Sequence, residues 1–347
     1  MDQVKSSLVI TSIASPNAPL KKFSEGCKQN NIDYFVIGDK SSPTDFKLDG
    51  CQFYSLEEQR SLDFSIVEYL PEKHYSRKNI GYLLAISKGA KIIIESDDDN
   101  LPLENFWESR KIYNEAYVLK NKAWFNVYKH FTEKNIWARG LPLEYLHSEA
   151  IDVASLNYHE VLCPIQQGLA NGNPDVDAIY RLVLELPVTF NNSKSIALGK
   201  GSWHPFNSQN TTWFDLAFPL LYLPTYCSFR MTDIWRSFVA QKIAWVNDWH
   251  ILYHQPNVFQ ERNEHNLLKD FEQEVPGYLY NSKITLALNQ LNLKTGTEYI
   301  LENLMICYDS LVVNGFIDKK ELKLVDAWIS DINEPIKQRN KPILSNS

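Results

Sequence analysis

The chain has 347 residues, 44 % of them hydrophobic and 13 % aromatic, which allows one large domain with a sizeable core. Its net charge of −7 and the lack of a basic stripe argue against nucleic acid as a partner. No apolar run reaches the roughly 18–20 residues of a transmembrane segment, and the N-terminus lacks the apolar core of a signal peptide. The sequence therefore predicts a protein that is cytoplasmic, or peripheral to a membrane.

The first hundred residues alternate between strand-like and helix-like segments. We predict strands at 8–13, 32–37 and 90–95, and helices at 19–31, in part of 55–70, and before Gly89. The last of these helices has Ile80, Leu83, Leu84 and Ser87 on one face, and Gly89 stands where helices commonly end in a left-handed residue. This β-α-β-α-β order predicts an α/β fold with a mostly parallel central sheet flanked by helices.

Three consecutive aspartates, Asp97, Asp98 and Asp99, follow the third predicted strand. Because neighbouring like charges repel by on the order of a few kcal/mol near a protein surface, water, a helix N-terminus or a bound cation must offset them. In extended backbone Asp97 and Asp99 point to one side and Asp98 to the other. This D-x-D suits Mn²⁺ or Mg²⁺, which prefer carboxylate oxygens, whereas an acidic turn that caps the next helix is the alternative.

Further polar residues are expected around the aspartates. Thr11, Ser12 and Asp39 end the other two strands at the same edge of the sheet, where such sheets bind ligands. Arg77 and Lys78 begin the helix before the acidic strand, where a helix N-terminus favours phosphate, although a solvated basic helix start is the alternative. Gly81 would let a ligand approach closely. The chain has neither G-x-x-x-x-G-K-[ST] nor G-x-G-x-x-G after its first strand, which argues against a P-loop enzyme and a dinucleotide-binding enzyme.

Five blocks in chain order carry a resemblance to a known family: RKNIGYLLAISKGAKIIIESDDDN, NGNPDVDAIYRL, NSQNT, FRMTDIWRSFVAQKIAW and VFQERNEHNLLKDFEQE. Together they resemble the STELLO glycosyltransferase-like family, which is distantly similar to the reversibly glycosylated polypeptides, the UDP-arabinose mutases. The resemblance implies a GT-A-like nucleotide-diphospho-sugar transferase fold with a C-terminal helical appendage. We accordingly expect a catalytic domain at 1–262, with a nucleotide-binding half at 1–100 and a half for sugar and acceptor at 101–262. A helical region at 263–335 and a disordered tail at 336–347 follow.

The function implied by the resemblance is a metal-dependent glycosyltransferase with a UDP-sugar as donor and a glycan, a lipid-linked glycan or a protein as acceptor. Asp97 and Asp99 would bind Mn²⁺ or Mg²⁺, and Asp39 could accept a hydrogen bond from N3 of uracil. Ser208, Gln209 and Arg181 would lie near the sugar. The residues expected to contact the nucleotide or its sugar are Thr11, Ser12, Asp39, Arg77, Lys78, Gly81, Asp98, Asp175, Asp177 and Asn207.

Two further assignments complete the expected site. Many GT-A enzymes add a C-terminal histidine to the metal, and among His250, His254 and His265 we prefer His265, which lies in a polar segment of a family block. Asp233, just after the predicted helix cap Thr232, is the candidate catalytic base for inversion, or else only supports its helix. A nucleotide-sugar mutase or autoglycosylating protein, and a catalytically silent scaffold, are the alternative functions.

Overall fold

The computed structural model describes residues 4–147, 151–261 and 266–333. The N-terminal part of its central sheet is parallel, with β1 between β2 and β4, and β3 at the edge beside β2. The bounds of these strands are β1 Ser6–Thr11, β2 Asp33–Ile37, β3 Gln52–Tyr54 and β4 Ile92–Ser96. The three predicted strands are present, whereas β3 was not predicted, because its three residues are too few to show a pattern.

The sheet continues beyond β4 as a mixed sheet. β12 is antiparallel to both of its neighbours, β4 and β9, whereas β9 and β13 are parallel to each other. Beyond β13 follow β10, β6 and β8, and β5 pairs with the far end of β13. The bounds are β5 Asn100–Pro102, β6 Tyr113–Leu119, β8 Tyr158–Leu162, β9 Ile165–Gly172, β10 Ile196–Leu198, β12 Asn210–Phe214 and β13 Ile251–Gln260; a small separate sheet joins β7 Ala123–Trp124 and β11 Ser202–Trp203.

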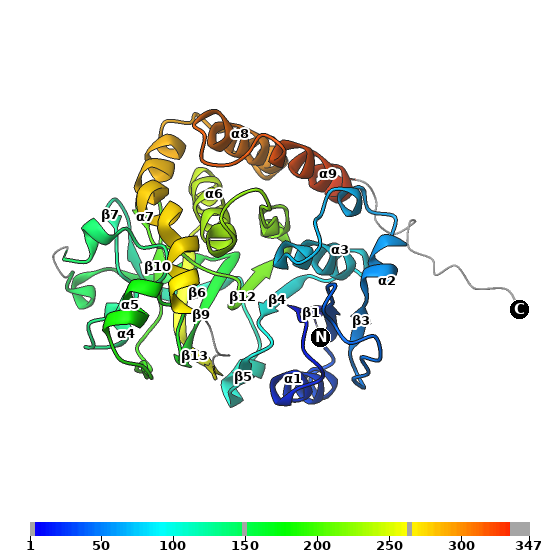
Figure 1. Ribbon diagram of the computed structural model, residues 1–347. Helices are drawn as coiled ribbons and strands as arrows, with labels where there is room; N and C mark the ends of the chain where they lie inside the picture. Colours follow the sequence, from blue (N-terminus) through cyan, green and yellow to red (C-terminus); the bar gives the residue numbers. More distant parts are fainter. Residues whose placement is uncertain (1–3, 148–150, 262–265, 334–347) are drawn as a thin grey trace, which may run out of the picture.

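Helices cover both faces of the sheet (Figure 1). α1 packs on one face, where it buries Leu20 and Phe23 against Leu8 and Ile10 of β1. α3 and α6 pack on the other face. The bounds are α1 Ala18–Gln29, α2 Leu56–Arg60, α3 Lys78–Ser87, α4 Tyr128–Phe131, α5 Ala178–Val183 and α6 Thr232–Val246. The predicted α/β class is therefore confirmed.

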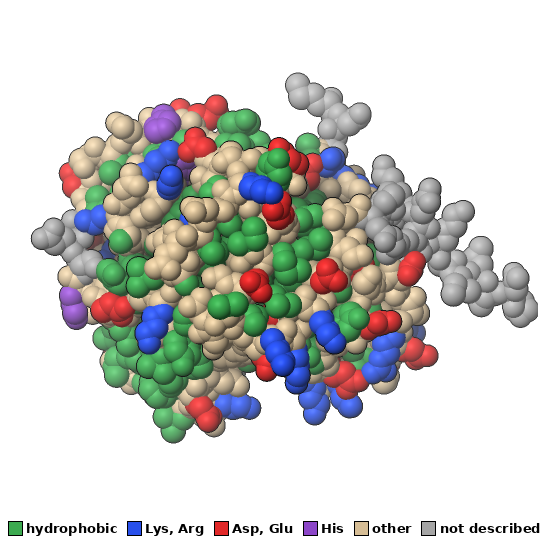
Figure 2. Space-filling view, turned by 90° about the horizontal axis from the view of Figure 1, so that it is seen from above, with side chains coloured by type: hydrophobic (Ala, Val, Ile, Leu, Met, Phe, Trp, Pro, Cys, Tyr) green, Lys and Arg blue, Asp and Glu red, His purple; other side chains and the backbone are tan. Residues whose placement is uncertain are grey.

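The C-terminal helices α7 Leu267–Asn289, α8 Ile300–Val313 and α9 Glu321–Asn333 arch over α6 and α3 (Figure 1). Leu288, Leu304 and Trp328 from these helices belong to the same hydrophobic cluster as α3 and α6. Seen from above, this side of the molecule mixes hydrophobic and charged side chains (Figure 2). Among the described residues no helix is long and apolar enough to cross a membrane. The predicted tail at 336–347 lies outside the described residues.

A buried ion pair fixes the end of β4 relative to α6. Glu95 lies in the middle of the sheet, where its carboxylate accepts hydrogen bonds from Arg236 at 2.8 and 3.0 Å and from the Trp213 indole at 2.8 Å. The hydroxyl of Tyr82 from α3 donates to the same carboxylate. Because a buried charge is tolerated only when it is paired and hydrogen-bonded, this network holds β4, α3 and α6 in one arrangement. The three aspartates begin two residues later.

The start of α6 differs from the prediction. Thr232 is already the first residue of the helix, and the preceding position is Met231, which makes no side-chain capping bond. The hydroxyl of Thr232 instead contacts Sγ of Cys227 at 3.5 Å. A 3₁₀ turn at Phe229–Met231 runs directly into α6, so the chain enters the helix already coiled and needs no Thr cap.

Candidate active site

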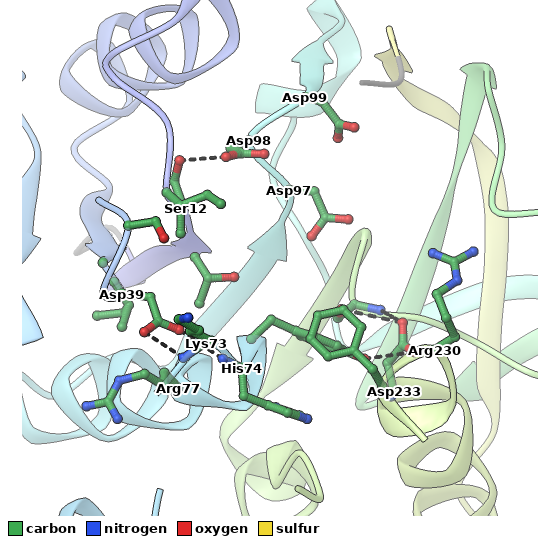
Figure 3. Close-up of a pocket in the computed structure, with 18 of the residues that line it drawn as sticks. Ser12, Asp39, Lys73, His74, Arg77, Asp97, Asp98, Asp99, Arg230 and Asp233 are labelled. Atoms are coloured by element: carbon green, nitrogen blue, oxygen red, sulfur yellow. Dashed lines mark hydrogen bonds between the residues drawn. The ribbon is translucent and has the colours of Figure 1, made fainter. Parts of the chain in front are cut away.

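The three aspartates form a turn rather than an extended segment, so the backbone expected for them is wrong. The amide of Asn100 donates to the carbonyl of Asp97 at 3.3 Å across this turn. Asp98 still faces away from its neighbours, since its carboxylate accepts from the Ser12 hydroxyl at 2.5 Å and its carbonyl accepts from Asn17 at 2.8 Å. Figure 3 shows Asp98 beside Ser12, with Asp97 and Asp99 directed elsewhere.

Asp97 and Asp99 stand where two cavities meet. The large cavity, of about 600 Å³, lies over the carboxyl ends of β1, β2 and β4, and the small cavity measures about 130 Å³. The residues that line both cavities are Asp97, Asp99, Arg139, Arg230 and Asp233. The two cavities thus adjoin at these residues, with room for a larger group on one side and a smaller group on the other.

Lys78 lies beneath the acidic turn and lines neither cavity, so its expected contact with the nucleotide sugar stays a prediction. Its side chain is fully buried, and Nζ donates to the carbonyls of Ser96 at 2.9 Å and Ser208 at 3.2 Å and to Oδ1 of Asp97 at 3.2 Å. Burial and the neighbouring Asp99 raise the pKa of Asp97 to about 7, although Lys78 acts in the opposite direction. One lysine therefore only partly offsets the negative charge of the turn.

The acidic turn fits a divalent cation that takes some of its ligands from the protein and the others from a substrate. Among the described residues no three His, Cys, Asp or Glu side chains are placed to hold a metal together. Asp97 and Asp99 could supply two carboxylates, and Mg²⁺ is commonly held by one or two carboxylates plus substrate phosphates. The incomplete compensation of Asp97 supports this fit, because a cation would stabilise its ionised form.

Two of the three histidines considered for the metal, His250 and His254, are not at this site. His250 lies just before β13 and His254 lies on it, and neither lines the large or the small cavity. His265 falls outside the described residues. The side chain that reaches Asp99 from this strand is Gln260, whose Nε2 donates to Oδ1 of Asp99 at 2.9 Å.

Arg77 lines the large cavity, but its guanidinium points away from the aspartates (Figure 3). Nε donates to Gln59 at 2.7 Å, and Nη1 donates to the carbonyls of Leu70 at 3.2 Å and Pro71 at 3.3 Å. The expectation that Arg77 binds phosphate is therefore corrected. Its bonds are used to hold the loop that leads to His74.

Gly81 also has a different role from the expected one. It lies inside α3, where an added Cβ would come within 2.4 Å of Val9 Cγ1 and 2.9 Å of Ile37 Cγ1. It does not line either cavity. Gly81 lets α3 approach β1 and β2 closely.

Gly81→Ala should consequently lower the free energy of unfolding by about 1–3 kcal/mol through overpacking. The affinity of the folded protein for nucleotide should not change. Urea denaturation of Gly81→Ala in the wild-type and Val9→Ala backgrounds tests this. The cost should shrink when Val9 is truncated, because the clash is with its methyl group. An equal cost in both backgrounds would contradict the packing role.

Asp39 holds a loop at the wall of the large cavity. Its carboxylate accepts from the amides of Lys40 at 2.7 Å, Lys73 at 2.8 Å and His74 at 2.9 Å. Asp39, Thr11 and Ser12 do line the large cavity, as expected. Most of this carboxylate is already engaged by backbone amides. The predicted contact of Asp39 with a uracil base stays a prediction.

An aromatic group on this wall was missed by the sequence analysis. The rings of His74 and Tyr75 stack at 5.7 Å, and Phe229 meets their edges at 5.1 and 4.9 Å. Burial lowers the pKa of His74 to about 4, so its ring is neutral near pH 7. Phe229 is 39 % exposed and lines the large cavity. An exposed ring on a packed base is a surface on which a planar heterocycle can stack. In the sequence, the rings of His74 and Tyr75 belong to the segment HYS, which directly precedes the first of the five blocks that resemble the STELLO family.

Arg139 connects two of the predicted site residues and was also missed. Its guanidinium forms a double hydrogen bond to Asp175, both at 2.8 Å, and a second one to Asp233 at 3.0 and 2.9 Å. Arg139 and both partners are almost fully buried. The three residues together line the small cavity. No local pattern around Arg139 pointed to this function.

Asp233 is therefore a poor candidate for the catalytic base. Besides Arg139, it accepts from the Ser208 amide at 3.1 Å and the Tyr75 hydroxyl at 3.2 Å. Burial alone would raise the pKa of Asp233, but Arg139 outweighs it and holds the pKa well below its usual range. A carboxylate with so low a proton affinity accepts a proton weakly. The structure favours the alternative of a supporting role, with Asp233 anchoring Arg139.

Two more expected sugar contacts are structural. Asp177 is fully buried as the N-cap of α5, where it accepts from the Tyr180 amide and the Trp137 indole, each at 2.7 Å. Asn207 is buried, and its side chain accepts from the Gln209 amide at 3.0 Å. Neither lines the two cavities. Their neighbours do, with Ser208 at the large cavity and Asp175, Arg181 and Gln209 at the small one.

Comparison with known proteins gives one family and two curated relatives. The family model described as STELLO glycosyltransferases matches residues 230–341. The Arabidopsis thaliana protein named probable glycosyltransferase STELLO2 is 28 % identical over 330 residues, which is 86 % of this chain and 41 % of that protein. The protein named probable glycosyltransferase STELLO1, from the same plant, is 26 % identical over 356 residues, 95 % of this chain and 44 % of that protein. The chain thus spans less than half the length of these relatives.

Solved structures match more distantly. A mycobacterial protein aligns with a TM-score of 0.37 and 10 % identity over 82 % of this chain and 74 % of that one. The M. tuberculosis glucosyl-3-phosphoglycerate synthase aligns with a TM-score of 0.36 and 12 % identity over 82 % and 79 %. S. aureus TarS gives 0.34 and 11 % over 96 % and 50 %. The family model and both curated relatives confirm that this chain is similar to the STELLO glycosyltransferases, as the five sequence blocks predicted.

Proposed function

We propose that this chain is a metal-dependent glycosyltransferase that uses a nucleoside-diphosphate sugar, with uridine as the nucleoside. The observation that carries the proposal is the meeting of a large and a small cavity at Asp97 and Asp99, above the buried cation Lys78. A nucleotide sugar has the matching shape, with a nucleoside on one side of its diphosphate and a sugar on the other. The names of the two Arabidopsis relatives support the same class of activity.

Each part of the site would bind a different part of the nucleotide sugar. The base would stack on Phe229 in the large cavity, and the sugar would enter the small cavity beside Asp175 and Gln209. Asp97 and Asp99 would hold Mn²⁺ or Mg²⁺, which would neutralise the diphosphate as it leaves. Arg230 lines both cavities and is oriented by Glu274, which accepts from its Nε at 3.1 Å and its Nη2 at 2.9 Å.

In the reaction the bond from the sugar to the diphosphate oxygen breaks and a bond to an acceptor oxygen forms. The proton of the acceptor hydroxyl must leave during this step. Because Arg139 holds Asp233 as a weakly basic carboxylate, the geometry favours a mechanism in which Asp233 is not the base. Retention, in which the oxygen of the leaving diphosphate can take this proton and no enzymic base of this kind is needed, is then the better account. The acceptor would be a glycan, a lipid-linked glycan or a protein.

Nucleotide binding measured by calorimetry tests the proposal. UDP should bind at least about tenfold more tightly than GDP or ADP, a difference of about 1.4 kcal/mol, and only with Mn²⁺ or Mg²⁺ present. The short Thr11 and Ser12 side chains and Asp39 lie where they could contact the smaller base. Equal affinity for the three nucleotides would contradict the uridine assignment alone.

The same protein and nucleotide sugars also distinguish the other candidate functions from a transferase. A protein that binds no nucleotide in a metal-dependent way would be a silent scaffold, and the proposed function would be wrong. A mutase would interconvert its UDP-sugar without any acceptor. A transferase should leave the donor sugar unchanged until an acceptor is added.

A further inference from the structure

A third cavity, of about 450 Å³, lies away from the candidate active site; we name it the rear cavity. Its floor includes Leu252 and His254 of β13. The alternate residues Ile251 and Tyr253 face the cluster that contains α6, so the rear cavity opens on the opposite face of the sheet. It shares no lining residue with the large or the small cavity.

Arg110 is the central cation of the rear cavity. Its side chain is half-buried and packs on the ring of Phe106, with 5.1 Å from Cζ to the ring centroid. Three of its N–H groups donate to neutral oxygens: the Thr212 hydroxyl at 3.0 Å and the carbonyls of Phe106 at 2.9 Å and Glu108 at 3.4 Å. Since arginine has five N–H donors, two remain without an acceptor among the described residues.

The guanidinium of Arg110 also has no counter-ion. In the described parts of the chain no carboxylate lies within 4.0 Å of it, as is also true of the buried Arg77, whereas the buried Arg139 and Arg236 are each paired with a carboxylate. Burial lowers the pKa of Arg110 to about 10, the direction expected for a desolvated cation without a counter-ion. A partly desolvated, unpaired cation with spare donors is suited to an external anion.

The remaining lining adds positive charge and neutral polar groups. The charged neighbours are Lys111, Lys194, Glu108 and Glu115, so cations exceed carboxylates in the rear cavity by one when Arg110 is included. Lys194 lies over the ring of Tyr158 at 4.3 Å, which holds its ammonium at the cavity.

The neutral side chains of the rear cavity suit hydroxyl groups. Gln166 donates to the carbonyls of Lys111 at 2.7 Å and Cys163 at 2.9 Å, which leaves its amide oxygen as an acceptor. Asn192, Ser193 and Ser195 add further donors and acceptors. Burial lowers the pKa of His254 to about 4, so its ring is a neutral hydrogen-bonding group near pH 7. The lining thus combines one anion-binding centre with many groups that bind hydroxyls.

We propose that the rear cavity is a second binding site, for a saccharide that carries a phosphate or carboxylate group, with the anion held by Arg110. The site goes beyond the proposed transferase function, because it needs neither the donor nor the metal. Lys111 and Lys194 add long-range attraction, and the amides of the cavity bind the hydroxyls of the sugar.

Ligand-observed saturation-transfer NMR and calorimetry test this with glucose 6-phosphate, glucuronate and neutral glucose as probes. Both charged sugars should bind, in the millimolar range or tighter, and glucose should bind at least about tenfold more weakly. Saturating UDP with Mg²⁺ should leave this binding unchanged, because the two sites are separate. Equal binding of glucose, displacement by UDP, or no binding of either charged sugar would overturn the proposal.

Variants locate the binding to this cavity. Arg110→Gln and Lys194→Gln should each weaken the binding of the charged sugars. The affinity should fall by about tenfold for Arg110→Gln and by less for Lys194→Gln. Lys319→Gln, at an exposed lysine outside the cavity, is the matched control and should bind as the wild type does. Should Arg110→Gln fail to fold, the double variant Lys111→Gln/Lys194→Gln changes only exposed side chains and must still weaken binding. Unchanged affinity in that double variant and in Arg110→Gln, or an equal loss in Lys319→Gln, would refute the assignment.

Discussion

Asp97→Asn and Asp99→Asn should each abolish the metal-dependent binding of UDP, with affinity falling by roughly 100-fold or more. Each change removes one of the two carboxylates at the junction of the cavities, and even the loss of an outer partner of a metal ligand costs about 10–100-fold in metal affinity. Calorimetry with UDP and Mn²⁺ measures the effect. The fold should stay intact in both variants. The thermal stability of metal-free Asp99→Asn should hold or rise slightly because a like charge is removed, whereas Asp97→Asn also removes the carboxylate partner of the buried Lys78 and should be less stable than Asp99→Asn.

Asp98 provides a comparison within the same turn. Its carboxylate is directed to Ser12 at 2.5 Å, and an asparagine could accept the same hydrogen bond. Asp98→Asn should therefore weaken the binding of UDP by less than about tenfold. Asp309→Asn, at an exposed aspartate on α8, should change nothing. Metal-dependent binding that survives in both Asp97→Asn and Asp99→Asn would remove the metal site from this turn.

The location of the acidic turn could be predicted because it depends on a local pattern. A β-branched apolar run predicts a buried strand, and the β-α-β-α-β order puts its carboxyl end beside those of β1 and β2. Both steps use only neighbouring residues and the rules of parallel sheets. The conformation of the turn could not be predicted in this way, because it depends on Ser12 and Asn17, which lie more than eighty residues earlier.

Long-range pairs and buried local hydrogen bonds account for these errors at the site. Arg139 was missed because its partners lie 36 and 94 residues further along the chain. Asp177 and Asn207 were assigned to the sugar because they are polar and lie in family blocks. The structure shows that burial and hydrogen bonding to neighbouring amides explain them instead. A polar residue type in a block of resemblance thus does not distinguish a ligand contact from a buried cap.

Glu95 shows the kind of signal that could have been used. A carboxylate inside the apolar run of β4 needs a buried partner, which Arg236 supplies from α6. A search of the sequence for that partner could have placed α6 next to the acidic strand.

The second large effect is expected for Arg139. Arg139→Met leaves the carboxylates of Asp175 and Asp233 buried without their shared cation, which should lower the free energy of unfolding by about 3–5 kcal/mol. Urea denaturation at several pH values measures this. In the wild type the pKa of Asp233 is depressed, so its stabilising contribution is present above the unfolded pKa of about 3.9 and is lost as the pH falls through the folded value.

In Arg139→Met the sign of this pH dependence should reverse. Without the guanidinium, burial raises the pKa of Asp233 above its unfolded value, so the folded state binds more protons than the unfolded state. The stability of the variant should then rise as the pH is lowered from 8 towards 5, and the gap to the wild type should narrow. A gap that is constant over this range would show that lost packing, not the unpaired carboxylates, causes the destabilisation.

Asp233→Asn then separates the anchoring function from catalysis. Arg139 keeps its double hydrogen bond to Asp175 in this variant, so the expected cost is about 1–3 kcal/mol of stability, the penalty of one impaired buried bond. Turnover of the folded enzyme, measured as a single-turnover rate at saturating donor, should stay within a few-fold of the wild type. A catalytic base would instead lose roughly 10²–10⁴-fold. A loss of that size, with stability and donor affinity unchanged, would restore Asp233 as the base and would mean that Arg139 releases it when the acceptor binds.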